Sequence, residues 1–150
     1  MKKPSSRIIE HLVGLLALGL ALSGLLIYAV QEPQRIAQAQ EAQLQRDLDD
    51  AMTLYAQNCS VCHGVAGEGI GATPALDNPA LRSSDAVALT KIISRGLFGT
   101  TMPAWHEEDG GTLSDYQIAT LVALIQSGDW QATQDRVVNL GLIPLVPFSA

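Results

Sequence analysis

Apolar residues are spread unevenly along the chain, and the longest uncharged stretch lies close to its beginning. Residues 12–30 (LVGLLALGLALSGLLIYAV) are 19 residues without a charge, close to the roughly 20 that a helix needs to cross a bilayer core. Three Lys or Arg residues precede this stretch, and only Arg35 lies close behind it. Because basic flanks favour the cytoplasmic side, the pattern predicts a single-pass transmembrane anchor, with residues 1–11 in the cytoplasm and the rest of the chain on the periplasmic side.

A cleaved signal peptide is the alternative interpretation of the same stretch. Its apolar run normally has about 7–15 residues and is followed at once by a small-x-small cleavage site. The run here is longer, and the nearest good site, Ala37-Gln38-Ala39, lies well beyond its end, with Ala29 as a weaker candidate. We therefore expect an uncleaved anchor in the lipid bilayer. Under either interpretation the bulk of the chain is exported.

The segment after the anchor, residues 31–48, is rich in Gln and Ala. These residues form helices readily, but the apolar face they offer is thin. We expect a helix-prone linker there rather than part of a core. A compact domain is predicted to follow over residues 49–128, with Asp49 or Asp50 as the N-cap of its first helix.

Apolar spacing predicts a second helix over residues 85–95, one face of which would be buried. Ser83 or Ser84 is expected to cap its beginning, and Gly96 to end it. The glycines and prolines of residues 64–79, which precede it, favour an irregular loop.

The last helix of the predicted domain has the clearest signals. Ser114 and Gln117 match the S-x-x-Q capping box, an apolar stripe with helical spacing follows, and Gly128 is a stop signal. No segment alternates between apolar and polar residues over the length of a strand. The sequence therefore predicts an all-α domain.

The final segment, residues 129–150, is again apolar. Eight of the twelve residues 137–148 are large and apolar, but Pro144 and Pro147 forbid a continuous helix there. We expect an extended tail, and an exposed apolar run of this kind usually marks an interface with a partner. The alternative is that the tail folds back onto its own domain.

Charge narrows the choice of partners. From Asp47 onward the chain has twelve Asp and Glu residues against four Arg and Lys residues. This balance argues against nucleic acid or an anionic lipid surface as a partner of the domain. It favours a basic docking surface or a fixed place in a complex, although acidity also serves solubility.

Both cysteines of the chain lie in the stretch N-C-S-V-C-H-G, as Cys59 and Cys62 followed by His63. A disulfide between them would close too short a loop to stabilise a domain much. A structural zinc site needs four ligands, and the remaining histidines are only His11, beside the predicted anchor, and His106. A thioredoxin-like redox pair would require a βαβ unit, and no strand is predicted.

The remaining interpretation is covalent haem attachment, of which C-x-x-C-H is the signature. Cys59 and Cys62 would each add to one vinyl group of the porphyrin, and His63 would bind the iron from the same side. A single haem c would also supply apolar mass to three short helices of roughly 80 residues, which form a marginal core by themselves. Haem attachment takes place outside the cytoplasm, where the charge pattern already puts the domain.

A sixth iron ligand is expected from the opposite face of the haem. Met102, in T-T-M-P-A-W, is the favoured candidate, because methionine opposite histidine is a common ligand pair in cytochromes c. Met52 precedes the cysteines on the same helix and is unsuitable. His106 is the rival ligand, and an open coordination site is the other alternative.

Residues 49–128 resemble class I monohaem cytochromes c. The matching residues are Leu54-Tyr55-Ala56-Gln57-Asn58-Cys59, Cys62-His63-Gly64, Gly67, Gly69, Ala72-Thr73-Pro74, Met102-Pro103-Ala104-Trp105 and Leu113-Ser114-Asp115. The resemblance implies a cytochrome c fold, three main helices around one covalent haem, in which the Pro74 carbonyl accepts a hydrogen bond from His63. Family members usually pair a glycine with an aromatic residue where this chain has Ala51 and Leu124. A larger residue facing a smaller one keeps the volume, so the helix crossing is expected to survive.

The predicted function is one-electron transfer between redox donor and acceptor proteins, without enzymatic activity of its own. The layout resembles monohaem subunits of quinol-oxidising membrane complexes such as alternative complex III, respiratory or photosynthetic. An independent membrane-tethered shuttle is the alternative. A haem sensor of a diatomic ligand is the rival from another class, with a displaceable Met102 and the acidic residues 107–109 nearby; we interpret those residues as a solvated loop.

Overall fold

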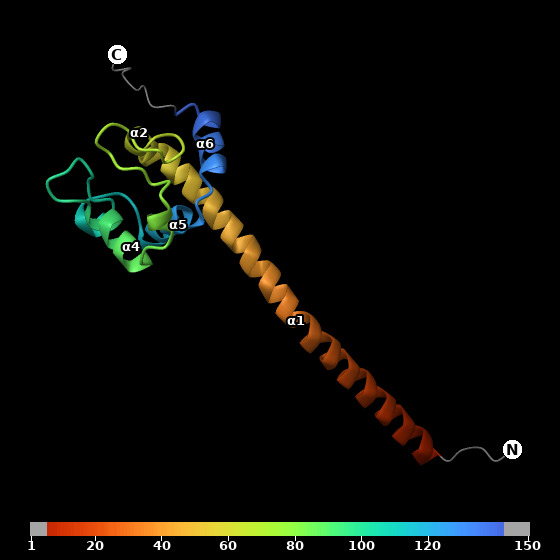
Figure 1. Ribbon diagram of the computed structural model, residues 1–150. Helices are drawn as coiled ribbons and strands as arrows, with labels where there is room; N and C mark the ends of the chain where they lie inside the picture. The colour runs from red at the N-terminus through yellow and green to blue at the C-terminus, as the bar shows by residue number, and fades with distance from the viewer. Residues whose placement is uncertain (1–5, 143–150) are drawn as a thin grey trace. The chain divides into compact units, whose positions relative to one another are not determined.

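The computed structural model describes residues 6–142 of the chain (Figure 1). The chain divides into two units, Met1–Leu44 and Gln45–Ala150. Helix α1 (Ser6–Asn58) provides the described part of the first unit and also the first helix of the second. The predicted cap at Asp49 or Asp50 is therefore wrong, because both residues lie inside α1. The Gln- and Ala-rich segment before them has high helix propensity, and extending a formed helix avoids the cost of starting a new one.

In the first unit, the apolar side chains of α1 are exposed throughout residues 12–30. An 18-residue window of this helix has a mean hydropathy of 2.3 and no part of it is buried. By length and composition the helix is able to cross a membrane, and an N-terminal signal sequence would satisfy the same criteria. A candidate anchor is therefore present where the sequence predicted one.

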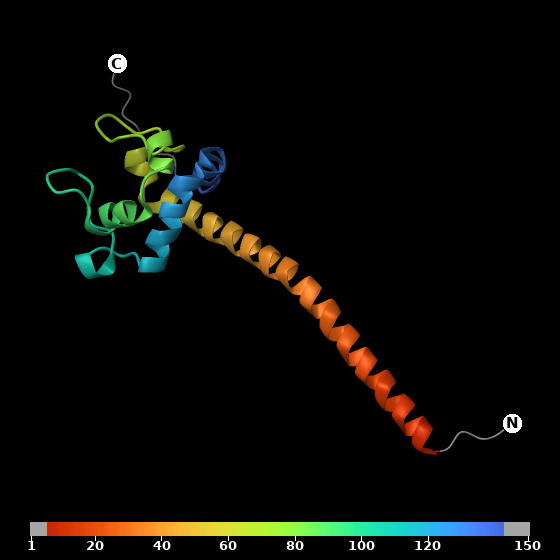
Figure 2. The ribbon, with the colours of Figure 1, turned by 60° about the horizontal axis from the view of Figure 1, so that its bottom comes forward.

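The second unit is built from helices joined by loops (Figures 1 and 2). Between residues 45 and 142 the only β pairing is an isolated bridge between His106 and Leu113, which agrees with the predicted all-α class. After α1, the helices are α2 (Ser60–His63), α3 (Pro79–Arg82), α4 (Ala86–Arg95), the 3-10 helix η1 (Glu107–Asp109), α5 (Asp115–Ser127) and α6 (Trp130–Asn139).

The boundaries of α5 follow the predicted signals. Ser114 and Gln117 form the reciprocal capping box, and Gly128 ends the helix in the left-handed conformation with φ of 69°. In α4, Gly96 is the C-cap as predicted, but the N-cap is Asp85, whose carboxylate accepts a hydrogen bond from the amide of Ala88 at 3.1 Å.

The serines expected to cap α4 belong instead to a helix that the sequence did not predict. Ser83 is the C-cap of α3, and the Ser84 hydroxyl donates to the Ala80 carbonyl at 2.8 Å. The first turn of α3 has its own signals, because the Asn78 side chain caps it and Pro79 follows directly. With only four residues, α3 is too short to show apolar periodicity.

Helix α6 replaces the first part of the predicted extended tail. Asp129 caps it, and Trp130, Thr133 and Val137 form a buried face with helical spacing. The prolines that argued against a helix, Pro144 and Pro147, come too late in the chain to affect these residues. Residues 143–150, the rest of the predicted tail, lie outside the described residues.

The core of the second unit lies among α1, α4, α5 and α6. Ala51 and Leu124, which replace the usual glycine and aromatic residue of the family, are both fully buried in this cluster. Tyr55, Ile118 and Val137 are the other large side chains with 1% exposure or less. The cluster supports the turn that carries both cysteines.

Candidate functional site

Cys59, Cys62 and His63 lie on one helical turn at the junction of α1 and α2. The Cys59 amide donates to the Tyr55 carbonyl at 2.8 Å, and the His63 amide donates to the Cys59 carbonyl at 2.9 Å. The backbone therefore stays helical through the motif. Residues three apart lie on the same side of a helix, so both thiols can reach one flat ligand. Neither thiol is in a disulfide; Cys59 is partly buried and Cys62 is exposed.

The environment of Cys59 favours the protonated thiol. Burial, followed by the neighbouring Cys62 thiol, raises its pKa to about 12. Because disulfide exchange proceeds through the thiolate, this position is poorly suited to redox cycling between the two cysteines. Addition of an S–H bond across a vinyl group needs no oxidant, since sulfur and hydrogen both end on the porphyrin substituent.

His63 is buried, with 8% exposure, and its ring is fixed by one hydrogen bond. Nδ1 lies 3.1 Å from the Pro74 carbonyl oxygen, which confirms the contact that the family resemblance implied. A carbonyl only accepts, so Nδ1 carries the proton and Nε2 keeps a free lone pair. Burial lowers the pKa of His63, partly offset by the Pro74 carbonyl. The neutral imidazole that results is the form that binds a metal.

The loop that carries Pro74 is closed by backbone hydrogen bonds. The Gly67 carbonyl accepts from the amides of Leu76 at 2.7 Å and Asp77 at 2.9 Å. The Gly69 amide donates to the His63 carbonyl at 2.7 Å. We call residues 64–77 the proximal loop. These bonds explain how a glycine-rich segment holds one carbonyl in place beside the imidazole.

The Met102 side chain is half-buried and packs against the hydrophobic core, as does Cys59. Its carbonyl accepts from the Leu97 amide at 3.2 Å, and its amide donates to the Thr100 hydroxyl at 3.2 Å. Gly96 has φ of 70°, and a Cβ on it would lie 2.6 Å from the Met102 carbonyl oxygen. The glycine that ends α4 thus also allows the Met102 backbone to pass close by.

Both ring nitrogens of His106, the rival ligand, have partners within the protein. Nδ1 accepts from the Glu108 amide at 3.2 Å, and Nε2 lies 3.1 Å from an Asp115 carboxylate oxygen. The side chain is buried between the 3-10 helix and the start of α5. His106 thus connects η1 to α5, and Glu107 and Glu108 on η1 are exposed. In residues 6–142 there is no group of three or more His, Cys, Asp or Glu arranged to hold a metal ion.

Sequence reasoning matched Tyr55 to a family motif but gave it no role. Its hydroxyl donates to the Gly64 carbonyl at 2.6 Å, next to the turn that carries Cys59, Cys62 and His63. Burial, followed by the nearby Cys59, raises the pKa of Tyr55 well above its ordinary value. Its spacing of four residues before Cys59 was the available signal, because i, i+4 positions share a helix face.

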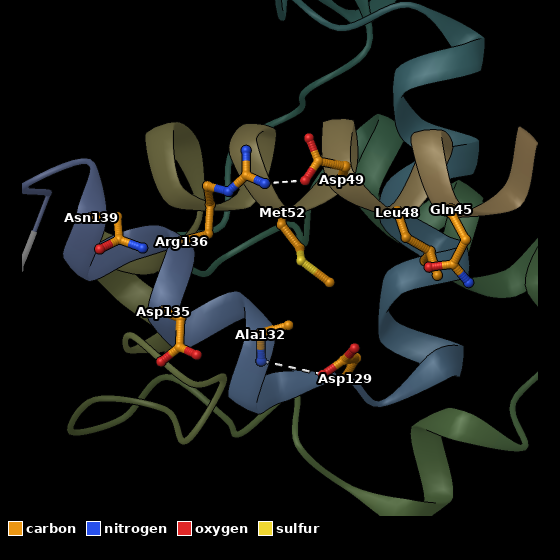
Figure 3. A pocket seen from close by; sticks show the side chains of 9 residues that line it. All are labelled: Gln45, Leu48, Asp49, Met52, Asp129, Ala132, Asp135, Arg136 and Asn139. Carbon is orange, nitrogen blue, oxygen red and sulfur yellow. Dashed lines mark hydrogen bonds and ion pairs between the residues drawn. The ribbon is translucent and has the colours of Figure 1, made fainter. Parts of the chain in front are cut away.

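A pocket of about 330 Å³ lies between α1 and α6, within the second unit. Figure 3 shows Arg136 reaching from α6 toward Asp49 on α1, with which it forms an ion pair. None of Cys59, Cys62, His63 or Met102 lines this pocket. Its lining residues are Gln45, Leu48, Asp49, Met52, Asp129, Ala132, Asp135, Arg136 and Asn139.

Two thiols and a neutral imidazole on one turn, with a half-buried thioether against the same core, are the donor set of a c-type cytochrome. The family model described as "Cytochrome C oxidase, cbb3-type, subunit III" matches residues 46–125, more than half of the chain. The chain therefore belongs to this cytochrome c family, whose members are electron carriers, and it carries a covalently bound c-type haem with its iron.

Two relatives have the name Cytochrome c55X. The protein from Stutzerimonas stutzeri is 35% identical over 111 residues, which cover 74% of this chain and 88% of the relative. The protein from Paracoccus denitrificans (strain Pd 1222) is 33% identical over 76 residues, which cover 48% of this chain and 73% of the relative. No solved structure matches the chain.

Proposed function

We infer that the protein is a membrane-tethered one-electron carrier in which His63 and Met102 would bind the haem iron. The observation that carries this inference is the hydrogen bond at 3.1 Å from Nδ1 of His63 to the Pro74 carbonyl. It leaves Nε2 as the only ring nitrogen available to a metal. It also makes the imidazole a stronger donor, because the Nδ1 proton is shared with an acceptor.

Met102 is the sixth ligand because its rival is engaged elsewhere. His106 uses both ring nitrogens within the protein, whereas the sulfur of Met102 has no such partner among the interactions found in residues 6–142. When bound, the haem supplies the Fe(II)/Fe(III) couple. Cys59 and Cys62 would attach the ring, and His63 and Met102 would both bind the iron, so a diatomic ligand would find no open position.

The anchor gives the carrier its location. The exposed apolar face of residues 12–30, with basic residues before it, supports a single-pass helix and a haem unit on the periplasmic side. The acidic composition after residue 47 supports protein partners with basic docking surfaces. Redox donor and acceptor proteins of a membrane electron-transfer chain are the partners that this arrangement serves.

A fixed place in a membrane complex is the second candidate role, within a quinol-oxidising assembly such as alternative complex III or a related respiratory or photosynthetic complex. The description of the matching family as a subunit of an oxidase favours it. The buried face of α6 argues against a fixed place in a complex, because Val137, the first residue of the apolar run, is fully buried within its own domain. That residue is then not free to contact a partner.

The test uses the full-length haem protein, extracted from membranes in mild detergent and run on a native gel stained for haem and protein. Migration at the mass of one haem-bearing chain supports the tethered carrier. Comigration with other integral proteins at fixed stoichiometry would contradict it and establish the fixed subunit. Exposing the reduced protein to carbon monoxide tests the sensor alternative, because a carrier with two axial ligands leaves the haem spectrum unchanged.

A further inference from the structure

Helix α6 begins after the end of the family match at residue 125, yet its first residue is buried against the haem-binding part of the domain. Trp130 is 4% exposed. Its ring meets the ring of Tyr55 edge-on, with the centroids 5.5 Å apart and the planes at 67°. The indole also lies against Gly67 of the proximal loop, since a Cβ added to Gly67 would be only 2.6 Å from Cε3 of the indole. Trp130 therefore touches α1 and the proximal loop together.

Both residues that Trp130 touches hold the proximal loop closed. The Gly67 carbonyl accepts the amides of Leu76 and Asp77, which joins the two ends of the loop. The Tyr55 hydroxyl donates to the carbonyl of Gly64, the first residue of the loop, at 2.6 Å. A shift of the indole would thus release a packing contact at both closures.

The same loop presents the Pro74 carbonyl to His63. Pro74 itself is exposed, so its position depends on the loop backbone and not on burial of its own ring. Gly67 has φ of 70° and is buried beneath the indole. Any other residue would be strained there and would collide with Trp130, so the close approach fixes the loop against α6.

Helix α6 is itself held firmly on α1. The Arg136 guanidinium donates to the Thr53 hydroxyl at 2.9 Å and pairs with Asp49 (Figure 3). Thr133 and Val137 are fully buried on the same helix face as Trp130. Polar contacts at one end and apolar packing along the face thus keep the indole in place.

We propose that Trp130 is a positioning residue for haem ligation: α6 clamps the proximal loop so that the Pro74 carbonyl stays bonded to Nδ1 of His63. This rests on the proposed function, in which His63 is an iron ligand. A carbonyl on Nδ1 makes the imidazole more basic and so favours Fe(III) over Fe(II). Loosening the clamp weakens that bond and raises the reduction potential.

The clamp acts through packing. The indole N–H of Trp130 is buried and has no hydrogen-bond partner in the part of the chain that the structure describes. Trp130→Phe keeps an aromatic ring beside Tyr55 but lacks the six-membered indole ring, including Cε3, that lies over Gly67, so it keeps only part of the clamp. Trp130→Ala removes the ring and opens the space over Gly67. Val138→Ala is the matched control, because Val138 lies on the same helix and is 48% exposed.

The experiment compares these full-length haem proteins in detergent by hydrogen–deuterium exchange with peptide-level mass spectrometry and by redox titration. In Trp130→Ala, the amides of Leu76 and Asp77 should exchange roughly tenfold faster, as expected for a loss of about 1.4 kcal/mol in local opening free energy. Amides within α5 serve as the internal reference and should change less. The reduction potential should rise. Val138→Ala should match the wild type in both measurements, and Trp130→Phe should lie between the wild type and Trp130→Ala.

Three results would overturn the clamp. They are unchanged exchange over residues 65–77 in Trp130→Ala, acceleration of α5 to the same extent with an unchanged potential, and a Val138→Ala variant in which residues 65–77 exchange as fast as in Trp130→Ala. If Trp130→Ala fails to retain haem, Trp130→Leu replaces it, with the same direction in both measurements. Failure of the proposed function is separate, because a wild-type spectrum without histidine–methionine ligation would reveal it before any variant is compared.

Discussion

At the scale of single residues, the strongest agreement between sequence and structure concerns His63 and its carbonyl partner. The C-x-x-C-H spacing predicts attachment because the chemistry demands two thiols and an imidazole on one turn. The Pro74 contact was implied by family resemblance and is present at 3.1 Å. In contrast, nothing in the sequence reveals that both ring nitrogens of His106 are engaged within the protein. Their partners are the backbone amide of Glu108 and the carboxylate of Asp115.

If Met102 and not His106 binds the iron, substitutions of these two residues should have different effects on the haem spectrum. Met102→Ala should open a coordination site, so that the reduced protein binds carbon monoxide and its potential falls, because a thioether ligand favours Fe(II). His106→Ala should leave the haem spectrum unchanged and only destabilise the fold, by roughly 1–3 kcal/mol for the buried contacts it loses. Absorption spectra with and without carbon monoxide decide between them. A carbon monoxide adduct in His106→Ala but not in Met102→Ala would reverse the assignment.

Because the Tyr55 hydroxyl is buried, we expect the stability of the folded protein to decrease at alkaline pH. Its folded-state pKa is raised above the ordinary value of 10.0 by burial, so above about pH 10 the unfolded state loses the tyrosine proton and the folded state keeps it. The contribution of Tyr55 to the free energy of unfolding should therefore be constant below about pH 10 and fall as the pH rises further. Tyr55→Phe should lack this part of the decline while costing about 1 kcal/mol at neutral pH for the lost hydrogen bond. Denaturant titrations of both proteins at several pH values provide the measurement, and parallel declines would refute the assignment.

At the scale of elements, the sequence predicted the helix boundaries that carry a local signal but missed the helices α3 and α6. The capping box of α5 and the glycine at the end of α4 are local signals, and both hold in the structure. A separate beginning was predicted for the first helix of the compact domain because Asp49 and Asp50 resemble caps. The helix propensity of the preceding segment instead lets the single helix α1 pass through both residues. Helix α6 was missed because Pro144 and Pro147 argued against a helix in the whole segment. The helical spacing of Trp130, Thr133 and Val137, which lie before these prolines, was the signal for it.

The corrected cap of α4 leads to an element-scale prediction. Asp85→Ala removes the carboxylate that accepts the Ala88 amide and should cost about 1 kcal/mol of unfolding free energy. Ser83→Ala is the control, because Ser83 was the expected cap but ends α3 with bonds of 3.2 Å and longer. Chemical denaturation of the two haem proteins measures the difference. A larger loss in Ser83→Ala would restore the original assignment.

At the scale of the whole molecule, the apolar length of residues 12–30 predicts a chain that keeps its N-terminus. The haem protein purified from membranes should have a mass that includes residues 12–30 and one haem. It should need detergent for release, because its apolar side chains are exposed on α1. Intact mass spectrometry after alkaline carbonate and detergent extraction checks both points. A mature N-terminus just beyond Ala39, in a protein released without detergent, would establish a signal peptide instead.

The position of α6 at the end of the described chain also has a consequence for the order in which the protein is made. Synthesis and export proceed from the N-terminus, and early segments fold before late ones emerge. Cys59, Cys62 and His63 therefore become accessible while Trp130 is still to come. The clamp that we propose on the proximal loop therefore forms only after α6 has been made, later than the turn that carries both cysteines.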